Sequence, residues 1–162
     1  MAPFALAISL IVAPALAADD SKEAWAALVD GGHVALIRHG NAPPGYGGDP
    51  PGFKTDDCKT QRNLVGRQQA KTLRESFRNH GVRVDRIRSS PWCRCVETAH
   101  LMAVSPVESS WALVPDMSPN ATVRLLELKE MVSTWRGPGT LVLVTHALTV
   151  RPLIGILPDP GV

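Results

Sequence analysis

The segment Val34-Ala35-Leu36-Ile37-Arg38-His39-Gly40 joins a short apolar run to a polar turn. Four consecutive apolar residues of strand length predict a buried strand of a parallel sheet, because such strands are covered on both faces. The segment Leu141-Val142-Leu143-Val144 repeats the pattern and ends on Thr145-His146. Ligands bind outside the carboxyl ends of strands in sheets of this kind, so these two strand ends predict a site.

Helical segments lie between the predicted strands. Residues 65–80 place Ala70, Leu73 and Phe77 on one helical face, and Gly81 is suited to end this helix. Alternating strands and helices predict an α/β fold, a three-layer sandwich around a mostly parallel central sheet. The other predicted elements are helices at 20–29, 90–102, 120–135 and 149–156, a strand at 82–87 and a short strand within 107–114.

The composition fits one globular domain. The chain has 162 residues, of which 44% are hydrophobic and 20% are charged. A domain of this length can bury a core without metal or disulfide support. The formal net charge is only +2, and Lys and Arg form no block of the kind that follows a nucleic-acid backbone. These values argue against a nucleic-acid partner and favour basic residues that bind an anion locally.

The N-terminal residues resemble a secretory signal peptide. An apolar run at 4–12 is followed by Ala15-Leu16-Ala17, and two aspartates then end the hydrophobic stretch. This pattern predicts a signal peptide at 1–17, a mature domain at 18–162 and a periplasmic or secreted location, without stable membrane insertion after cleavage. The alternatives are an ordinary N-terminal helix or strand and an uncleaved membrane anchor.

The chain contains three cysteines, Cys58, Cys93 and Cys95. In an oxidising compartment Cys58 could form a disulfide with either of the other two, which are poor partners for each other at their spacing. One thiol would then remain, and the alternative is three unpaired thiols. A Cys-x-Cys sequence without a second cysteine pair is a poor indication of a zinc site.

Three predicted strand ends carry related side chains: Arg38-His39, Arg88 with Ser89-Ser90, and Thr145-His146. If these strands are neighbours, two imidazoles and at least one guanidinium lie at one edge of the sheet. Guanidinium groups match phosphate oxygens in two-point hydrogen bonds, and a histidine can attack phosphorus to form a covalent intermediate. A helix that starts at Ser90-Pro91 would add backbone N–H donors for an anion.

These segments resemble the histidine phosphatase superfamily, which includes the cofactor-dependent phosphoglycerate mutases. The matching stretches are Leu36-Ile37-Arg38-His39-Gly40, Arg88-Ser89-Ser90-Pro91-Trp92-Cys93-Arg94-Cys95-Val96-Glu97-Thr98-Ala99 and Leu143-Val144-Thr145-His146. Gln61-Arg62-Asn63-Leu64 and Gly66-Arg67-Gln68-Gln69-Ala70 resemble the family's first-helix segment. The resemblance implies a phosphoglycerate mutase-like fold. The family commonly continues past the last helix into another strand, and this edge strand could be absent from the present chain.

The resemblance assigns the central chemistry to four residues. His39 would attack phosphorus and become phosphohistidine. Arg38 and Arg94 would bind the phosphoryl oxygens, and His146 would lie opposite the nucleophile and stabilise the transferring group. The resemblance implies no metal and no cofactor, because these side chains supply the positive charge.

Three further residues are candidates for substrate binding, namely Asn41, Arg62 and Thr145. Glu97 follows Arg94 by three residues, and we expect it to form an ion pair with Arg94 or with Arg62 and so to orient the site.

In the family, a carboxylic acid between the second and third matching stretches protonates the leaving group. Asp116 is the best candidate here and Glu108 is the next, because Glu127 and Glu130 fit the period of the helix predicted at 120–135. A general acid contributes typically 10²–10⁴-fold, so a poor acid would slow the hydrolysis of alkyl phosphates most. Val123, Leu126 and Met131 fit the same helical period.

These assignments predict a phosphoric monoester hydrolase that acts through a phosphohistidine on His39. An alternative within this class is a phosphatase for phosphohistidine or for envelope phosphosugars such as heptose phosphates. Two other classes remain open, which are phosphoryl transfer between hydroxyl groups, as in the mutases, and a non-catalytic phosphate-binding module. The expected partner is a phosphorylated small molecule.

Overall fold

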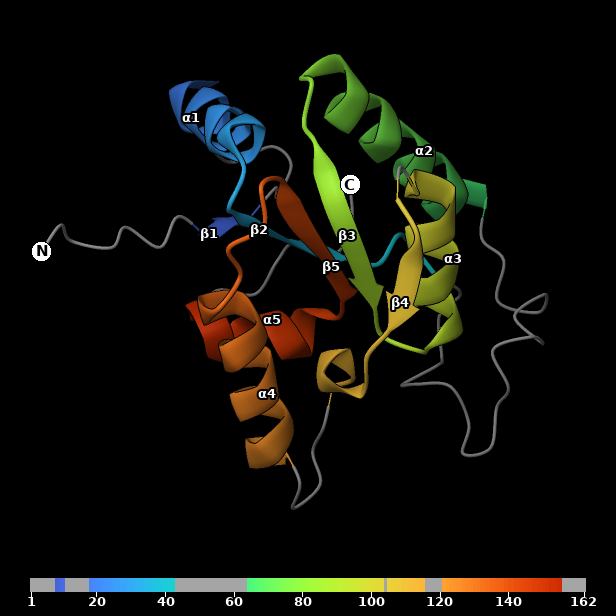
Figure 1. Ribbon diagram of the computed structural model, residues 1–162. Coiled ribbons are helices and arrows are strands. Elements are labelled where there is room, and N and C mark those ends of the chain that lie inside the picture. Colours follow the sequence, from blue (N-terminus) through green and yellow to red (C-terminus); the bar gives the residue numbers. More distant parts are fainter. Residues whose placement is uncertain (1–7, 11–17, 43–63, 104, 116–120, 156–162) are drawn as a thin grey trace, which may run out of the picture.

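The computed structural model describes residues 8–10, 18–42, 64–103, 105–115 and 121–155. They form an α/β unit in which helices cover both faces of one sheet (Figure 1). The strands are β1 (Ile8–Leu10), β2 (Val34–Arg38), β3 (Val84–Ser89), β4 (Val107–Ser109) and β5 (Thr140–Thr145). The helices are α1 (Ala18–Asp30), α2 (Leu64–Asn79), α3 (Cys93–Met102), the 3-10 helix η2 (Trp111–Leu113), α4 (Ala121–Ser133) and α5 (Ala147–Ile154).

The sheet has the order β1-β2-β5-β3-β4, and its described strand pairs are all parallel. The last strand in sequence, β5, therefore lies between β2 and β3, as Figure 1 shows. In the register of the sheet, Arg38 of β2 is opposite Thr145 of β5, and Val144 of β5 is opposite Ser89 of β3. The carboxyl ends of these three strands are consequently neighbours.

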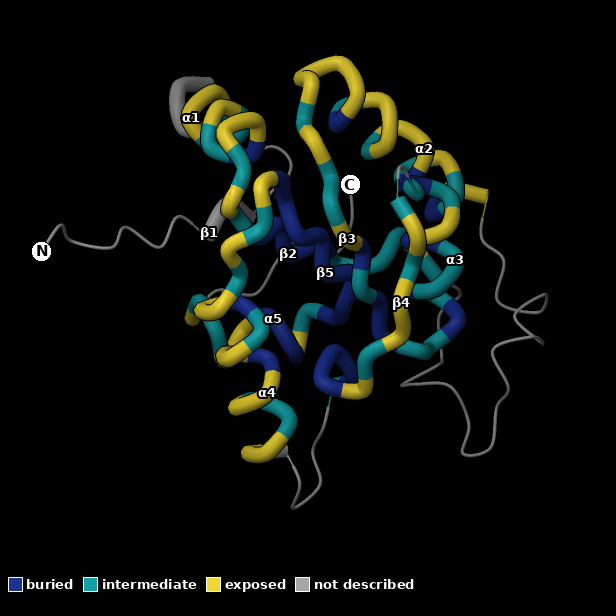
Figure 2. The backbone as a smooth tube through the Cα atoms, in the orientation of Figure 1, coloured by how far each residue is buried: buried dark blue, intermediate teal, exposed yellow. Residues whose placement is uncertain are grey.

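The two central strands alternate their side chains between the faces of the sheet. In β2, Ala35 and Ile37 belong to one core cluster, whereas Val34 and Leu36 belong to a second. The first cluster also contains residues of α1, α2 and α3, and the second contains residues of η2 and α4. Figure 2 shows β5 and much of β2 in dark blue, at the buried centre. The predicted three-layer sandwich with a parallel sheet is confirmed.

The predicted inner face of α2 is confirmed. Ala70 and Phe77 are almost completely buried, and Leu73 packs against the first core cluster. Gly81 follows the helix with a φ of 72°, a left-handed conformation that glycine adopts without steric cost. Most of the other elements lie close to their predicted positions.

The buried face of α4 leaves out some of the apolar residues that fit the predicted helical period. Val123 and Leu126 are 55% and 60% exposed, whereas Leu128 and Val132 are almost completely buried. Leu128 and Val132 are four residues apart on one face, and they share the second core cluster with Ala112 of η2. The sequence of α4 carries two apolar stripes, and packing against η2 and the sheet selects the one that the periodicity did not favour.

The helix predicted from Ser90 begins three residues later. α3 starts at Cys93 and has Trp92 as its N-cap residue. The backbone N–H of Ser90 donates to Val144 O at 2.9 Å, so Ser90 extends the hydrogen bonding between β3 and β5 and cannot yet be helical. The strand predicted at 82–87 begins and ends two residues later and spans Val84–Ser89.

Among the described strands, the N-terminal strand β1 pairs with β2 alone and forms one edge of the sheet. Its residues, Ile8–Leu10, lie within the predicted signal peptide. In the full chain they form a strand, which is one of the alternatives to a signal peptide. Cleavage after Ala17 would remove β1 and leave β2 at the edge. None of the described helices is long and apolar enough to cross a membrane.

Candidate active site

The neighbouring ends of β2, β5 and β3 bring the two predicted histidines together. The imidazole rings of His39 and His146 have centroids 5.1 Å apart and planes inclined by 66°. The backbone N–H of His39 donates to Thr145 O at 2.9 Å, which continues the β2–β5 ladder just beyond β2. Sheet hydrogen bonding therefore holds the backbone that carries His39 beside the strand that leads into His146.

His39 is held in one tautomer by the residue that follows it. Its Nδ1 lies 2.8 Å from Gly40 O. A carbonyl oxygen only accepts hydrogen bonds, so Nδ1 carries the proton and Nε2 carries the lone pair. Burial, with smaller effects of the Arg94 and Arg38 charges, lowers the pKa of His39 to about 4, although the bond to Gly40 opposes this shift. The imidazole is therefore neutral near pH 7, and Nε2 can act as a nucleophile.

Two arginines supply the positive charge of the site. Arg38 ends β2 and Arg94 lies in the first turn of α3, and the charges of both act on His39 and His146. The Nε and Nη2 atoms of Arg94 are buried and have no hydrogen-bond partner among the described residues. Buried charged donors without acceptors are unfavourable, so this guanidinium is suited to an oxyanion that would supply the acceptors.

His146 is the N-cap residue of α5 and is only 5% exposed. Its Nε2 lies 3.1 Å from Ser90 Oγ and 3.3 Å from Cys95 Sγ. The Trp92 ring packs against the imidazole with centroids 4.7 Å apart. Burial, together with the charges of His39 and the two arginines, lowers the pKa of His146 to about 2. Both imidazoles of the site are therefore neutral near pH 7.

A threonine on α3 connects the His39 turn to the helix that carries Arg94. Thr98 Oγ1 donates to Arg94 O at 2.7 Å and accepts the backbone N–H of Gly40 at 3.0 Å. The residue is only 5% exposed, so these two bonds satisfy a buried hydroxyl and a buried N–H. One hydroxyl thus fixes the relative positions of the predicted nucleophile and the predicted phosphate ligand.

The first turn of helix α2 packs directly against the backbone of Gly40 and Asn41, just after His39. A Cβ atom added to Gly66 would lie 2.0 Å from Asn41 O, and one added to Gly40 would lie 2.6 Å from Gly66 O. Such a close approach of two backbones requires glycine at both positions. Gln69 strengthens the contact, because its Oε1 accepts the N–H of Asn41 at 2.7 Å.

Thr145, a predicted substrate ligand, does not present its hydroxyl to the site. Its Oγ1 donates to Leu113 O at 2.7 Å, and the residue is completely buried. The reason is the alternation of β5, since Thr145 follows Leu141 and Leu143 on the face covered by η2. Thr145 contributes its carbonyl oxygen, which accepts the N–H of His39.

Asn41 and Glu97 lie beside the site. Asn41 is exposed, and its backbone N–H donates to Gln69 Oε1. Glu97 Oε1 lies 3.7 Å from Arg67 Nε, an ion pair that the sequence did not predict. Arg62 and the predicted proton donor Asp116 both lie outside the described residues.

The second candidate acid, Glu108, is engaged elsewhere. It lies opposite Arg88 in the β3–β4 register, and the two side chains form an ion pair with an N–O distance of 3.4 Å. The Glu108 side chain is about half exposed on β4, at the edge of the sheet. The Arg88 side chain is therefore engaged in this surface pair.

Sequence reasoning did not select the side chains that surround His146 and Gly40. These are Ser90, Trp92, Cys95 and Thr98, all within the second matching stretch. A signal was present only for Thr98, which follows Arg94 by four residues and so lies on the same face of α3. The contacts of the other three depend on how β5 is placed next to β3, which no local pattern in the sequence specifies.

The cysteines match the predicted alternative in which one disulfide forms and one thiol remains. Cys93 is disulfide-bonded, whereas Cys95 is a buried thiol outside any disulfide. Three unpaired thiols are therefore excluded, and Cys58 lies outside the described residues. In the described part of the chain, no group of three or more His, Cys, Asp or Glu side chains is arranged to hold a metal ion.

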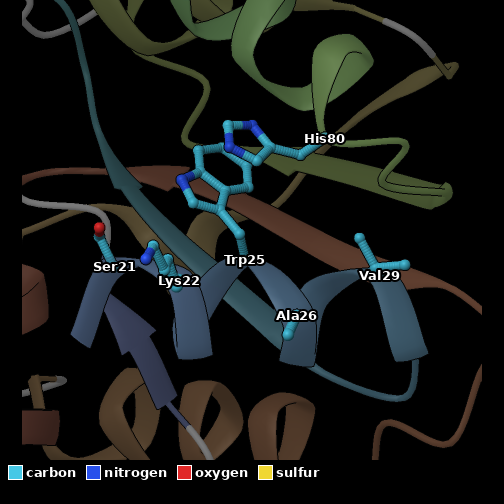
Figure 3. A pocket seen from close by; sticks show the side chains of 6 residues that line it. All are labelled: Ser21, Lys22, Trp25, Ala26, Val29 and His80. Atoms are coloured by element: carbon cyan, nitrogen blue, oxygen red, sulfur yellow. The ribbon is translucent and has the colours of Figure 1, made fainter. Parts of the chain in front are cut away.

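A separate pocket of about 370 Å³ lies between α1 and the end of α2. In Figure 3 the Trp25 indole and the His80 imidazole overlap face to face, and their centroids are 4.0 Å apart with nearly parallel planes. The other lining residues come from α1 (Ser21, Lys22, Ala26 and Val29). None of these residues belongs to the histidine and arginine cluster, so this pocket is not the candidate active site.

Residues 34–113 match the family model described as histidine phosphatase superfamily (branch 1). The matched span runs from β2 to η2 and contains Arg38, His39 and Arg94, whereas His146 lies beyond it. No curated protein matches the chain.

Solved structures share the fold at low sequence identity. A protein from Agrobacterium tumefaciens assigned as the phosphohistidine phosphatase SixA is 22% identical, with a TM-score of 0.51 and coverage of 76% of this chain and 77% of that one. A Nakamurella multipartitia protein with the same assignment is 19% identical, with a TM-score of 0.51 and coverage of 74% and 61%. An Escherichia coli K-12 protein assigned as an α-ribazole-5′-phosphate phosphatase is 17% identical, with a TM-score of 0.50 and coverage of 75% and 79%.

Proposed function

We propose that this chain, whose residues 34–113 match the histidine phosphatase superfamily (branch 1), is a metal-independent phosphatase that hydrolyses phosphomonoesters through a phosphohistidine on His39. The observation that carries the proposal is the orientation of His39. Its Nδ1–H is bound by Gly40 O, its Nε2 lone pair remains for attack, and the ring faces His146 across 5.1 Å. The buried donors of Arg94 supply the partner that a phosphoryl group requires.

In the first step, Nε2 of His39 attacks phosphorus. A P–N bond forms, the P–O bond to the leaving group breaks, and the departing oxygen takes up a proton. The phosphorylated ring carries a positive charge, because Nδ1 keeps its proton. Gly40 O accepts the hydrogen bond of Nδ1–H and so stabilises the charge, and the Arg94 guanidinium neutralises the phosphoryl oxygens.

In the second step, a water molecule attacks the phosphohistidine. A P–O bond forms to the water oxygen, the P–N bond breaks, and inorganic phosphate leaves with His39 restored to its neutral state. The proton lost by the water balances the one taken up by the leaving group in the first step. Two easier displacements thus replace one difficult hydrolysis.

The substrate class that fits best has a good leaving group. Glu108 is paired with Arg88, and the charges acting on His39 from the described residues are the two arginines, with no carboxylate among them. A site in which proton donation is weak would hydrolyse phosphohistidine and aryl phosphates faster than alkyl phosphates. Two of the structural neighbours carry the phosphohistidine phosphatase assignment, which supports the same preference.

The test is phosphate release from p-nitrophenyl phosphate by purified protein. The wild type should turn over, and His39→Ala should lower the rate at least about 10³-fold, since no other described side chain can replace the nucleophile. His100→Ala is the matched control, because His100 is an exposed histidine on α3. Equal release by wild type and His39→Ala would refute the proposal.

The same assay separates the other candidate classes. Phosphate binding without release would identify a non-catalytic binding module. Transfer of the phosphoryl group to an added diol, at a rate that exceeds hydrolysis, would identify a mutase-like activity. Comparison of a phosphohistidine peptide with an alkyl phosphate measures the proposed leaving-group preference.

We further propose that the chain is exported and cleaved after Ala17. The support is the Ala15-Leu16-Ala17 sequence behind the apolar run, the start of α1 at Ala18, and the disulfide at Cys93, which suits an oxidising compartment. N-terminal sequencing of protein recovered from the periplasm or medium should begin at Ala18. Recovery of the intact N-terminus from the cytoplasm alone would contradict export.

A further inference from the structure

Ser90 is the buried residue whose hydroxyl touches His146. It is completely buried, and Oγ lies 3.1 Å from His146 Nε2. The same Oγ accepts the backbone N–H of Trp92 at 3.3 Å. The hydroxyl therefore has two partners among the described residues, and one of them can only be a donor.

The hydroxyl hydrogen of Ser90 decides which nitrogen of His146 carries the proton. A buried hydroxyl needs an acceptor for its hydrogen, because a buried donor without one costs about 1–3 kcal/mol. The N–H of Trp92 cannot accept, so the acceptor left in the described surroundings is His146 Nε2. A nitrogen that accepts a hydrogen bond carries no proton, and in a neutral imidazole the proton is then on Nδ1.

We propose that Ser90 is a positioning residue that fixes His146 in the Nδ1–H tautomer. The consequence rests on the proposed function: Nδ1–H of His146 is the hydrogen-bond donor available to the phosphoryl group transferred to His39. Among the described residues Nδ1 of His146 has no hydrogen-bond partner, whereas Nε2 is occupied by Ser90. Without the Ser90 hydroxyl, His146 would no longer be held in the Nδ1–H tautomer. No group that touches the phosphate would be removed by this change.

The neighbouring thiol supports this arrangement without determining it. Cys95 Sγ lies 3.3 Å from His146 Nε2, but it also donates to Thr145 O at 3.5 Å. A thiol is a weaker donor than a hydroxyl, and it has this carbonyl as an alternative acceptor. Ser90 therefore supplies the hydrogen bond to Nε2, and Cys95 fills the space beside it.

The experiment is a nitrogen-15 NMR measurement of histidine tautomers at neutral pH on the full folded protein. The chain has five histidines, and the signals of His146 are those lost in His146→Gln. Long-range couplings from the ring protons distinguish a protonated Nδ1 from a protonated Nε2. The expected wild-type result is a His146 with the proton on Nδ1.

Ser90→Ala should shift His146 toward the Nε2–H form, whereas Ser89→Ala should not. Ser89 is the matched control, because it is equally buried and its hydroxyl donates to Ser90 O without touching His146. Cys95→Ala should keep the Nδ1–H form. Single-turnover phosphorylation of His39 should fall about 10-fold in Ser90→Ala, through loss of one oriented donor.

A wild-type His146 protonated on Nε2 would overturn the inference, even if Ser90→Ala does not fold. An unchanged tautomer in folded Ser90→Ala would overturn it equally. The NMR result needs no substrate, so it stands apart from the proposed function. If the wild type shows the Nδ1–H tautomer but forms no phosphohistidine, the proposed function fails and the tautomer assignment holds.

Discussion

The two histidines of the site differ in what surrounds their nitrogen atoms. His39 Nδ1–H donates a hydrogen bond to Gly40 O. The two residues are adjacent, and the turn after β2 brings these atoms together. His146 receives its contacts from Ser90 and Cys95, which belong to a different strand end and helix. The orientation of His39 is therefore set by local backbone, and that of His146 by the packing of β5 against β3.

Arg94 gives a prediction at this scale. Arg94→Ala should weaken binding of phosphate or orthovanadate by about 10-fold or more, because charge-assisted hydrogen bonds to the anion are lost. The free energy of unfolding should change by less than about 1 kcal/mol, because two buried donors without protein partners are removed with the charge. Calorimetric titration and denaturant unfolding measure the two quantities.

Arg88→Ala is the control for this measurement. Arg88 comes from the same stretch of sequence, but its side chain pairs with Glu108 on the surface. This variant should bind the anion like the wild type. Equal anion affinity in Arg94→Ala and Arg88→Ala would contradict the assignment of Arg94 as the phosphate ligand.

At the residue scale, the sequence could place both histidines, because each follows a recognisable strand, and it could select Arg94 through the family resemblance. It could not place Thr145 correctly. A strand end offers two faces, and the register of β5 turns the Thr145 hydroxyl toward Leu113 O. It also could not find Ser90, since the hydrogen-bond partner of that hydroxyl lies 56 residues away.

The elements α2 and α3 hold the His39 turn from two sides. α3 contributes the Thr98 hydroxyl, which binds Gly40 N–H and Arg94 O. α2 contributes Gly66, whose backbone lies against Asn41. Each contact joins the turn after β2 to a helix, so the geometry of the site depends on how these helices pack against the turn.

Thr98→Val tests the contribution of α3. It keeps the shape of the side chain but removes the acceptor of the Gly40 N–H, which should cost about 1–3 kcal/mol of stability. Phosphorylation of His39 should slow about 10-fold, because the nucleophile and Arg94 lose their common hydroxyl. Thr98→Ser keeps the hydroxyl and should restore the rate. If Thr98→Val and Thr98→Ser phosphorylate equally fast, the hydroxyl has no positioning role.

Gly66→Ala tests the contribution of α2. The added Cβ would lie 2.0 Å from Asn41 O, so the helix or the turn must move, at a cost of about 1–3 kcal/mol and with loss of activity. Gly81→Ala is the control, since its Cβ would meet open space and only its positive φ would cost about 1–2 kcal/mol. Full activity in Gly66→Ala would show that the close approach is not needed.

Helix α4 shows where element-scale prediction from the sequence is limited. The positions of the helices could be predicted because apolar period and glycine stops are local signals. The inner face of α4 could not, because the helix has two apolar stripes. Contact with η2 and with the sheet makes Leu128 and Val132 the buried pair.

At the scale of the whole molecule, the strand order creates the site. The sequence predicts three strand ends with related chemistry, but it does not state that β5 inserts between β2 and β3. That insertion depends on pairing between segments about a hundred residues apart in sequence. It places His146 between the ends that carry His39 and Ser90.

The buried histidines predict how the stability of the whole molecule depends on pH. Their folded pKa values lie below the ordinary value of 6.5, at about 4 for His39 and about 2 for His146. The unfolded chain therefore binds more protons as the pH falls below 6.5, and the folded state loses stability. In phosphate-free buffer, the free energy of unfolding should decrease from pH 7 to pH 4, by at most about 1.4 kcal/mol per pH unit for each histidine.

His146→Gln separates this effect from carboxylate titration. The variant should unfold with a shallower dependence on pH between 6.5 and 4 than the wild type, because one buried neutral imidazole is absent. Chemical denaturation at several pH values gives the two slopes. Identical slopes would mean that His146 titrates in the folded protein as it does in the unfolded chain.

The central claim is that the phosphoryl group passes through His39, and trapping the intermediate tests it most directly. Protein mixed with a phosphorus-32-labelled aryl phosphate is quenched within the first turnover, digested and sequenced by mass spectrometry. The account predicts an acid-labile, base-stable phosphate on the peptide that contains His39, present in wild type and His100→Ala and absent in His39→Ala. Label on any other residue, or turnover by the wild type without protein-bound phosphate, would contradict it.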